Sequence, residues 1–301
     1  MTVLRDGKSI GTWKVNDISE KDLIKALVGR EITQLFPKTK VPLKQELLRV
    51  EGLSRIGYFS EVSFSLRAGE ILGFSGLVGS GRTEVAQAVF GIAPADRGKI
   101  FVEGKEVNIQ SPMDAISHGI GYLPEDRLRQ GLFLPMTINE NITITIIDQL
   151  SQKGWLNPPK EQEISTKMLN LLKIKAPDVF HLVSSLSGGN QQKVVVAKLL
   201  AARLKILIMD EPTQGVDVGT KAAIHQIMSD LVAEGFGIIM ISSEMPEVLG
   251  MSDTILVMHE GRVNRIFSRE EATQEKLMEA AVNVDRSFWK KEISTAVQNR
   301  E

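Results

Sequence analysis

Two short motifs carry residue types that suit phosphate chemistry. The first is Leu186–Lys193, which reads LSGGNQQK, and the second is the acidic pair Asp210 and Glu211 at the end of an apolar run. A small hydroxyl and two glycines at the start of a helix predict an anion site, because free amides and the helix dipole point at the ligand. Two carboxylates after a buried strand predict a magnesium ligand and a general base. Together these motifs predict a centre that binds and hydrolyses a nucleotide.

A third motif, Gly76–Thr83, reads GLVGSGRT and lies between an apolar run and a helical pattern. Its glycines let backbone amides turn inward around phosphates, and Thr83 offers a hydroxyl to magnesium. Arg82 stands where this loop motif has a lysine, and its planar guanidinium can contact phosphate only with a different geometry. A glycine-rich turn without a ligand is the alternative, and the other two motifs disfavour it. The expected nucleotide-binding residues are Gly76, Gly79, Ser80, Gly81, Arg82, Thr83 and Glu84.

The acidic pair and the first motif have distinct expected roles. Asp210 is expected to hold magnesium through water, and Glu211 to polarise the attacking water. An acidic strand end at a loop is common, but its position after the other two motifs favours catalysis. Ser187 is a natural N-cap for a helix that runs to Arg203. If an inserted subdomain separates this helix from the glycine-rich loop, its dipole must serve a second module placed head to tail.

Composition narrows the class of protein. The chain has 301 residues, 43% hydrophobic residues, a formal net charge of −1 and no cysteine. These values allow a substantial core, offer no basic surface for nucleic acid, and exclude disulfides. The sequence lacks an apolar run of about 18 residues, and MTVLRDGKSIG lacks the apolar core of a signal peptide. We therefore expect a soluble, cytosolic chain whose membrane contact is made through a partner.

The elements that must position these motifs alternate between strands and helices. An apolar helical stripe lies within Ala223–Leu231, and the region around Met113–Leu204 is expected to be a mainly helical insertion. Strand–helix alternation predicts an α/β sheet with parallel strands. The expected strands are Val62–Leu66, Ile71–Phe74, Lys205–Asp210, Gly237–Ser242 and Thr254–Met258.

The chain also contains a hidden repeat. Val3–Lys8 resembles Val257–Arg262, and at the same offset of 254 positions Ser19–Ala26 resembles Thr273–Ala280. Two matching blocks make chance similarity of two hairpins less attractive than a true repeat. We therefore expect the chain to begin within the tail of one module and to contain a second. The expected segments are a tail at 1–33, a linker at 34–45 with Pro37 and Pro42, a nucleotide-binding domain at 46–285 with its helical insertion at about 113–204, and a polar tail at 286–301.

As a set, these motifs resemble the ATP-binding cassette family, and more narrowly the carboxy-terminal cassettes of bacterial monosaccharide importers for ribose, galactose and xylose. The ribose-import members are most similar, above all through Ser243–Val282, and residues 1–30 resemble the end of that family's first cassette. The resemblance covers almost the whole chain. It implies a P-loop α/β fold with a parallel-sheet core, an antiparallel β subdomain and an inserted helical subdomain. Its motifs are Gly73–Glu84, Gly121–Arg127, Leu186–Lys193, Asp210–Val218 and Ser242–Leu249.

The resemblance assigns further roles and shows three departures. Glu125 stands where most cassettes have a glutamine that contacts magnesium, and Ser243 stands where most have a catalytic histidine. With Arg82, these changes weaken the chain's own site, although Glu211 remains. The resemblance implies catalytic Glu211 and Ser243, metal contacts from Thr83, Asp210 and Glu125, a site for the partner's ATP at Ser187, Gly188, Gly189, Asn190 and Gln191, and an inter-site loop at Asp217.

The family's cofactors and partners are also implied by the resemblance. They are ATP, Mg²⁺, a second cassette that is normally in the same polypeptide, membrane permease subunits and, indirectly, a periplasmic sugar-binding protein. The expected location is the cytoplasmic face of the bacterial inner membrane, bound peripherally. Two alternatives stay open: a non-hydrolytic module that activates a partner, and a soluble cassette ATPase of translation or DNA repair, which the net charge disfavours. The sugar is open as well, and an autoinducer-type furanosyl ligand is a second candidate.

Several isolated residues have weaker assignments. Tyr58 is a candidate for stacking on adenine, with a packing role as the equal alternative. Four histidines have no metal-ligand partner at helical or loop spacing, so we expect them to have surface or core roles. They are His118, His181, His225 and His259.

Overall fold

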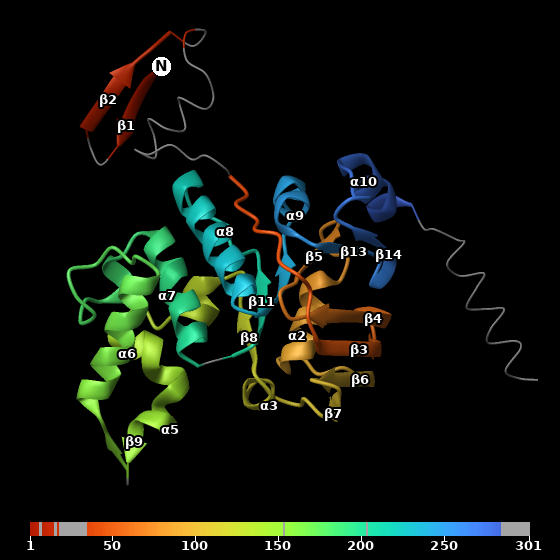
Figure 1. The fold of residues 1–301 in the computed structure, drawn as a ribbon, viewed down its shortest axis with the longest axis horizontal. Helices are drawn as coiled ribbons and strands as arrows, with labels where there is room; N and C mark the ends of the chain where they lie inside the picture. The colour runs from red at the N-terminus through yellow and green to blue at the C-terminus, as the bar shows by residue number, and fades with distance from the viewer. Residues whose placement is uncertain (6–7, 15–16, 18–34, 153, 203, 284–301) are drawn as a thin grey trace, which may run out of the picture.

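The computed structural model describes residues 1–5, 8–14, 17, 35–152, 154–202 and 204–283 (Figure 1). Two expected segments, the first-copy helix at Ser19–Ala26 and the polar tail at 286–301, lie outside the described residues. Gln34, the expected start of the linker, lies outside them too.

A six-stranded sheet forms the centre of the molecule, in the order β14-β13-β5-β12-β11-β8. All neighbouring strands are parallel except β14, which pairs antiparallel with β13 at one edge. The apolar runs predicted from the sequence thus form buried strands of an α/β fold. The strands are β5 (Ile71–Gly76), β8 (Ile120–Leu123), β11 (Ile206–Asp210), β12 (Gly237–Ile241), β13 (Thr254–His259) and β14 (Arg262–Ser268).

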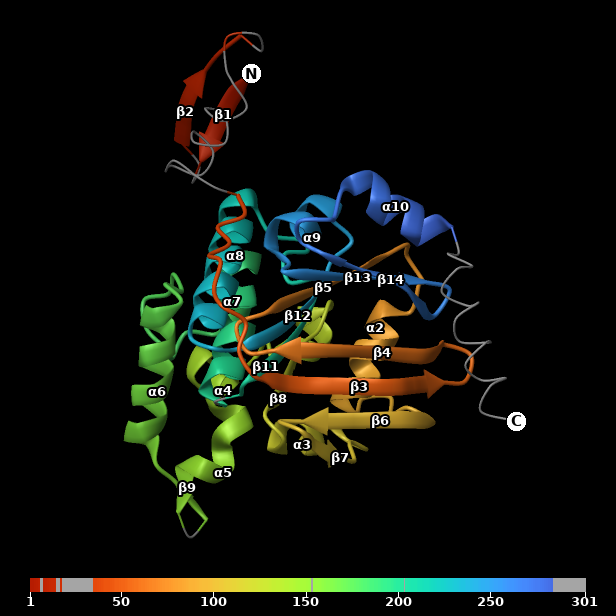
Figure 2. The ribbon, with the colours of Figure 1, turned by 45° about the vertical axis from the view of Figure 1, so that its right-hand side comes forward.

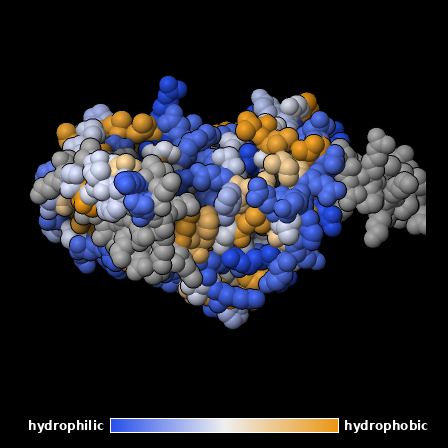
Figure 3. Space-filling model, turned by 90° about the horizontal axis from the view of Figure 1, so that it is seen from above, coloured by the Kyte–Doolittle hydropathy of each residue, from blue (hydrophilic) through white to orange (hydrophobic). Residues whose placement is uncertain are grey.

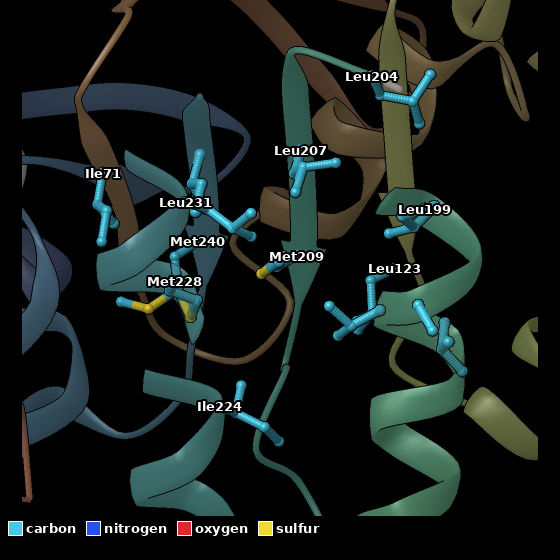
Figure 4. Close-up of a cluster of buried hydrophobic side chains, with 14 of the residues drawn as sticks. Ile71, Leu123, Leu199, Leu204, Leu207, Met209, Ile224, Met228, Leu231 and Met240 are labelled. Atoms are coloured by element: carbon cyan, nitrogen blue, oxygen red, sulfur yellow. The ribbon is translucent and has the colours of Figure 1, made fainter. Parts of the chain in front are cut away.

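Each face of this sheet is covered by its own hydrophobic cluster. Because side chains alternate along a strand, Leu207 and Met209 enter one cluster while Ile206 and Ile208 enter the other. Figure 4 shows the first cluster, which gathers side chains from the sheet and from the helices packed on it, with Met228 as one helical member. Burial on both faces explains why the strands lack a polar alternation.

A second, antiparallel sheet with the order β4-β3-β6-β7 packs on the other face (Figure 2). Its inward residues join the second cluster together with α2, which follows the glycine-rich loop. This sheet is the antiparallel subdomain that the family resemblance implied. The elements are β3 (Glu46–Arg55), β4 (Phe59–Arg67), β6 (Arg97–Val102), β7 (Lys105–Val107), α2 (Arg82–Phe90) and α3 (Pro112–Ser117).

Helices dominate the middle of the chain, where α7 packs against α4, α6 and β8. Three strands differ from our expectation of a mainly helical 113–204: β9 and β10 form a short hairpin, and β8 is the edge strand of the central sheet. β8 is the one that bears on the site. Its four residues are too few for a period to emerge from the sequence. The elements are the π-helical turn η2 (Arg127–Gly131), α4 (Ile138–Thr143), the 3₁₀ turn η3 (Ile144–Ile146), α5 (Ile147–Leu150), β9 (Ser151–Gln152), β10 (Trp155–Leu156), α6 (Pro158–Leu171), the 3₁₀ turn η4 (Val183–Ser185) and α7 (Gly188–Ala201).

Three helices complete the cover of the first face. They are α8 (Val218–Ala233), α9 (Met245–Met251) and α10 (Gln274–Val282). The segment 36–45 has no helix or strand and runs beside α8 before β3 begins (Figure 1). This segment lies within the expected linker at 34–45, whose role as a linker stays a prediction.

The N-terminal residues form a hairpin of β1 (Thr2–Arg5) and β2 (Lys8–Thr12). Its pairing repeats that of β13 and β14: Val3 faces Gly11 as Val257 faces Arg265, each 254 positions later. In both hairpins the register shifts after the same position, Val3 in one and Val257 in the other. The two repeat blocks therefore share a backbone irregularity as well as a sequence pattern.

No helix in the described part of the chain has the length and apolarity needed to cross a bilayer. On the face seen in Figure 3, hydrophobic side chains form small groups separated by hydrophilic ones. Such scattered groups are normal on a folded domain and need no partner to explain them.

Candidate functional site

Four parallel strands end at the same edge of the central sheet, and the candidate residues follow them. The glycine-rich loop follows β5, Glu125 follows β8, and Asp210 and Glu211 stand at the end of β11. Ser243 follows β12, the strand between β5 and β11. Ligands of open α/β sheets bind at the carboxyl ends of such strands. The topology thus brings together the nucleotide-site residues expected from the sequence.

The glycine-rich loop owes its shape to the absence of side chains. Gly76 has a φ of 148°, and a Cβ there would clash with the Met258 carbonyl oxygen. Gly79 has a φ of 80° and faces open space. Gly81 has a left-handed conformation and caps the start of α2, so the first amides of that helix are free to bind an anion. The loop thus has the shape of a phosphate cradle, and phosphate binding here stays a prediction.

Asp210 is fully buried, and its two carboxylate oxygens have different surroundings. The Tyr122 hydroxyl donates to Asp210 Oδ2 over 2.9 Å, and the Thr83 side chain lies close enough to this carboxylate to oppose the rise of its pKa. Asp210 Oδ1 is buried without a hydrogen-bond partner among the described residues. Burial raises the pKa of Asp210. An orphaned buried carboxylate oxygen beside a hydroxyl fits a divalent cation, which would favour the ionised form.

The cation would have to draw on ligands other than a protein cage. In the described ranges, no cluster of three or more histidine, cysteine, aspartate or glutamate residues could hold a metal. Magnesium is usually held by one or two carboxylates together with waters and substrate phosphates. Thr83 and Asp210, which lie beside the glycine-rich loop, fit this mode of magnesium binding.

Glu211 has a strained backbone at the point where it would act. Its φ is 47°, in the left-handed region that a glutamate seldom adopts. Its amide donates to the Ile241 carbonyl over 2.9 Å, and Ser243 Oγ donates to Glu211 Oε2 over 3.2 Å. Burial raises the pKa of Glu211, an effect that the Ser243 hydroxyl opposes. Strain of this kind gathers at active sites, because surrounding contacts hold the residue in place.

Arg82 is 8% exposed and lies among the carboxylates of the site. Its Nη1 donates to the Ser242 carbonyl oxygen over 3.0 Å. Burial lowers the pKa of Arg82, while the charges of Glu211, Asp210 and Glu84 oppose that shift. The guanidinium therefore balances the acidic residues and supports the end of β12, a role that a lysine in this place would fill differently.

Glu125 stands at the exposed rim of the same site. Gln214 Nε2 donates to Glu125 Oε1 over 3.2 Å. Arg127 reaches the same loop, and its Nη1 donates to the Gln214 carbonyl over 2.9 Å. The segment after β8 is thus tied to the loop after β11, and the exposed Glu125 side chain lies at the rim of the candidate site.

The motif Leu186–Lys193 begins α7 but differs from our expectation in one detail. Ser187 occupies the N-cap position, yet its side chain makes no capping bond to the helix. Instead, Asn190 Nδ2 donates to Ser187 Oγ over 3.0 Å, and Asn190 Oδ1 accepts from the Lys175 amide over 2.9 Å. Because Asn190 uses the Ser187 hydroxyl, the first amides of α7 keep no side-chain acceptor and can receive an anion.

This motif and the glycine-rich loop lie in different parts of the molecule. In Figure 1, α7 stands with α6 on the far side of β8 from α2. A Cβ on Gly188 would lie 2.9 Å from Arg127 Nη2, so the motif also touches a cation. Gly189 lacks a side chain because a Cβ there would clash with Thr220 of α8. The glycines thus serve close packing as well as an anion site.

Asp217 caps α8, since its carboxylate accepts from the Thr220 amide over 3.0 Å and from the Thr220 hydroxyl over 2.7 Å. Burial alone would raise the pKa of Asp217, but these bonds lower it. The residue therefore has a clear structural role, and its expected role between two sites stays a prediction.

Three residues of this region were missed by sequence reasoning. Tyr122 binds Asp210, and His225 and Glu247 form a buried pair behind the loops. Each partner is distant in the chain, so spacing holds no signal, although His225 could have been suspected from its place within the apolar stripe of α8.

Tyr58 is exposed, and the Arg55 guanidinium lies 4.2 Å from its ring centroid. Stacking on adenine stays a prediction for this residue.

Comparison with known families and proteins places these features in context. The sequence pattern of the ABC transporter family matches residues 59–214, just over half of the chain. The chain is 48% identical over 286 residues to the ribose import ATP-binding protein of Geobacillus kaustophilus, covering 95% of this chain and 58% of that protein. It is 49% identical over 281 residues to a putative ribose/galactose/methyl galactoside import ATP-binding protein of Hahella chejuensis, covering 93% of this chain and 55% of that protein. The chain thus spans little more than half the length of these relatives.

Solved structures of similar fold include ATP-binding cassettes of ABC transporters. A nucleotide-free ATP-binding cassette from an ABC transporter is 25% identical, with a TM-score of 0.67 over 79% of this chain and 100% of that one. An ATP-binding cassette in its ADP conformation is also 25% identical, with a TM-score of 0.65 over 80% of this chain and 96% of that one.

Proposed function

Because the chain belongs to the ABC transporter family, we propose that it is an ATP-binding cassette which helps to power the import of a monosaccharide such as ribose. The relatives that cover almost all of its length are import proteins for ribose or for ribose and galactose. Sugar recognition lies in other components of such importers, so an autoinducer-type furanosyl sugar stays a second candidate.

One observation carries the proposal: the phosphate cradle, the buried Asp210 and the strained Glu211 meet at one edge of the sheet. The loop amides and the start of α2 would bind the ATP phosphates. Thr83 and Asp210, with Glu125 at the rim, would hold magnesium, which when bound neutralises phosphate charge. Glu211 would orient the attacking water and take its proton, and Ser243 would hold Glu211 in place.

We further propose that this site is the weaker of two. Arg82 is engaged by the Ser242 carbonyl and by neighbouring carboxylates, and Ser243 offers a neutral hydroxyl. Glu125 adds negative charge beside the phosphates, which costs affinity. The same observations favour the second candidate function, a non-hydrolytic cassette that binds nucleotide and activates a partner.

The chain would act as the second cassette of a two-cassette protein, with residues 46–285 as its nucleotide-binding domain and residues 1–33 as the end of the first. The shared register of the two hairpins supports this arrangement. Ser187–Gln191 would then bind ATP held by the first cassette, and Asp217 would lie between the sites. Further partners would be permease subunits and, through them, a periplasmic sugar-binding protein, at the cytoplasmic face of the inner membrane. The net charge of −1 offers no support for nucleic-acid binding.

Nucleotide titration of the full chain tests the proposal. We expect ATP with Mg²⁺ to bind weakly. We expect Asp210→Asn to weaken binding further, because it removes the carboxylate charge that would hold magnesium. Thr39→Ala, which alters an exposed side chain of the segment before β3, is the matched control. No binding by the unaltered chain would contradict the proposal.

Single-turnover hydrolysis separates the two candidate functions. In a two-cassette protein that carries this chain as its second half, Glu211→Gln should slow only the turnover at this site, and the same change in the first cassette should slow the other. If Glu211→Gln leaves the rate unchanged, this cassette binds without hydrolysis and the second candidate is correct.

A further inference from the structure

A buried charged pair lies directly behind the proposed nucleotide site. His225 of α8 and Glu247 of α9 are each 1% exposed, and His225 Nε2 lies 2.6 Å from Glu247 Oε1. Thr213 Oγ1 donates to the same oxygen over 3.0 Å, and Ser242 Oγ donates to the other. A buried carboxylate is costly unless its oxygens are satisfied, and here three donors satisfy them.

The partners of the pair indicate its charge state. His225 Nδ1 lies 2.8 Å from the Leu35 carbonyl oxygen, which can only accept, so Nδ1 carries a proton. Burial alone would raise the pKa of Glu247, but hydrogen bonds from His225 and Ser242 lower it. Glu247 is therefore held as a carboxylate, and the His225 ring lies between it and the Leu35 carbonyl oxygen, within hydrogen-bond distance of both.

On one side, Glu247 accepts hydrogen bonds from both loops that carry the proposed catalytic residues. Thr213 lies two positions after Glu211, and Ser242 immediately precedes Ser243. A shift of Glu247 would therefore move both loops, and with them the hydrogen bond between Ser243 and Glu211. Displacements of about 1 Å at a catalytic group can cost about 100-fold in rate.

On the other side, the pair holds the segment Leu35–Lys44, which we call the docking segment. The ring of Phe36 lies 5.3 Å from that of His225, at 40°. Phe36 packs where Gly250 of α9 has no side chain, since a Cβ there would clash with its ring. Lys38 pairs with Asp253 over 2.8 Å, and the Thr39 amide donates to Ser229 Oγ over 2.9 Å.

We propose that Glu247 and His225 are positioning residues which couple attachment of the docking segment to the alignment of Glu211 and Ser243. The inference rests on the proposed function, because it concerns the same nucleotide site. The docking segment leads from the N-terminal hairpin to the cassette, so the pair lets the preceding part of the chain influence this site. Coupling is reciprocal, so nucleotide must in turn change the state of the docking segment.

The test follows the docking segment and nucleotide binding separately in the full chain. The sequence has no cysteine, so Lys40→Cys gives a single exposed position for an environment-sensitive fluorophore. The probe ligand is a non-hydrolysable ATP analogue with Mg²⁺, and its binding is measured independently by calorimetry. We expect the fluorophore to respond to the analogue with the midpoint found by calorimetry.

The variants then remove either the pair or its contact with the docking segment, and none of them alters a residue of the proposed nucleotide site. His225→Leu and Phe36→Ala should bind the analogue within about threefold of the parent, below about 1 kcal/mol, yet lose the fluorescence response. His225→Gln keeps polar groups toward Glu247 and should keep part of the response. Phe64→Leu removes a comparable apolar contact from the other hydrophobic cluster and should keep all of it.

The outcomes separate the two proposals. If the analogue binds but the fluorophore of the parent does not respond, the coupling is refuted while the proposed function stands. The same holds if the response in both His225→Leu and Phe36→Ala equals that of the parent. If the analogue does not bind, the proposed function fails and takes the coupling with it. Should His225→Leu not fold, Phe36→Ala decides the matter, since Phe36 lies outside the fully buried core.

Discussion

At the scale of single residues, the site is a balance of buried charges. Asp210 and Glu211 lie in surroundings that raise their pKa values, and the buried Arg82 offsets this burial effect. Tyr122 and Ser243 each donate one hydrogen bond to these acids. Arg82 therefore supports the fold, and under the proposed function it would have a second task toward a phosphate.

Substitution of Arg82 separates these tasks. Arg82→Gln should weaken Mg-ATP binding about tenfold, or about 1.4 kcal/mol, because a charge near the phosphates is lost. It should also lower the free energy of unfolding by about 2 kcal/mol, since Asp210 and Glu211 lose their nearest cation. Arg82→Lys keeps the charge and serves as the control. Calorimetric titration and urea unfolding measure the two effects, and unchanged affinity in Arg82→Gln would show that Arg82 serves the fold alone.

Lys198 provides a pH-dependent test that is independent of nucleotide. Burial lowers the pKa of Lys198 from 10.5 to about 8, and its ammonium donates to the Gly131 carbonyl. Between these values the unfolded chain binds more protons than the folded one, so stability should rise with pH across this window. Below about pH 8 the folded state carries the full free-energy cost of burying the charged Lys198 ammonium.

Lys198→Met should therefore stabilise the chain at pH 7 by about 1 kcal/mol, after allowance for partial exposure and the lost hydrogen bond. The gain should vanish above about pH 10.5, where the unfolded lysine is neutral too. Lys167→Met, at an exposed position of α6, is the matched control. Urea unfolding at pH 7 and pH 10.5 measures both, and a gain of equal size at the two pH values would be inconsistent with a charge effect.

At the scale of elements, two helices begin in opposite ways. The Asp217 side chain bonds to the Thr220 amide and closes the start of α8, whereas the Ser187 side chain leaves the start of α7 without a cap. Capping stabilises a helix, while free amides can bind an anion. The start of α8 thus has a structural task, whereas the start of α7 is free for the binding task that we propose for it.

Matched alanine substitutions test this contrast. Asp217→Ala should cost about 1 kcal/mol of stability, because the α8 cap is lost, and Asp217→Asn should restore most of it. Ser187→Ala should change stability by less than about 0.5 kcal/mol, since no cap exists to lose. Urea unfolding of the three variants measures these effects. An equal cost for both alanine variants would contradict the difference in capping.

Sequence and structure agree where a pattern is local. The strand Ile206–Asp210 and the turn of Gly76–Thr83 follow from apolar runs and glycine positions, so both were predicted. The edge strand β8 was not, because four residues carry too little periodicity. Nor was the contact between Glu247 and Thr213, because a side-chain hydrogen bond between distant loops leaves no trace in spacing. Partners inside the site are thus harder to predict than the elements that hold them.

At the scale of the whole molecule, the two functional motifs lie apart. The glycine-rich loop belongs to the central sheet and α2, while Ser187–Gln191 belongs to the helices beyond β8 (Figure 1). Under the proposed function, one chain would therefore supply half of each of two sites, its own loop for one and its α7 for the other. If hydrolysis requires both halves, it requires two modules.

This division predicts how the isolated chain should behave as its concentration changes. Two copies can complete each other's sites only when they meet, so turnover per chain should rise with protein concentration from a negligible value in dilute solution. Ser187→Ala should lower the turnover reached at high concentration by about 10- to 100-fold, because an α7 contact to phosphate is removed, while leaving weak nucleotide binding in place. Lys167→Met, at an exposed position of α6 that has no proposed role in either site, is the control for folding. Phosphate release over a wide range of chain concentrations measures both effects. A specific activity that stays constant across this range would show that one chain completes a site alone, and the head-to-tail arrangement would then be wrong.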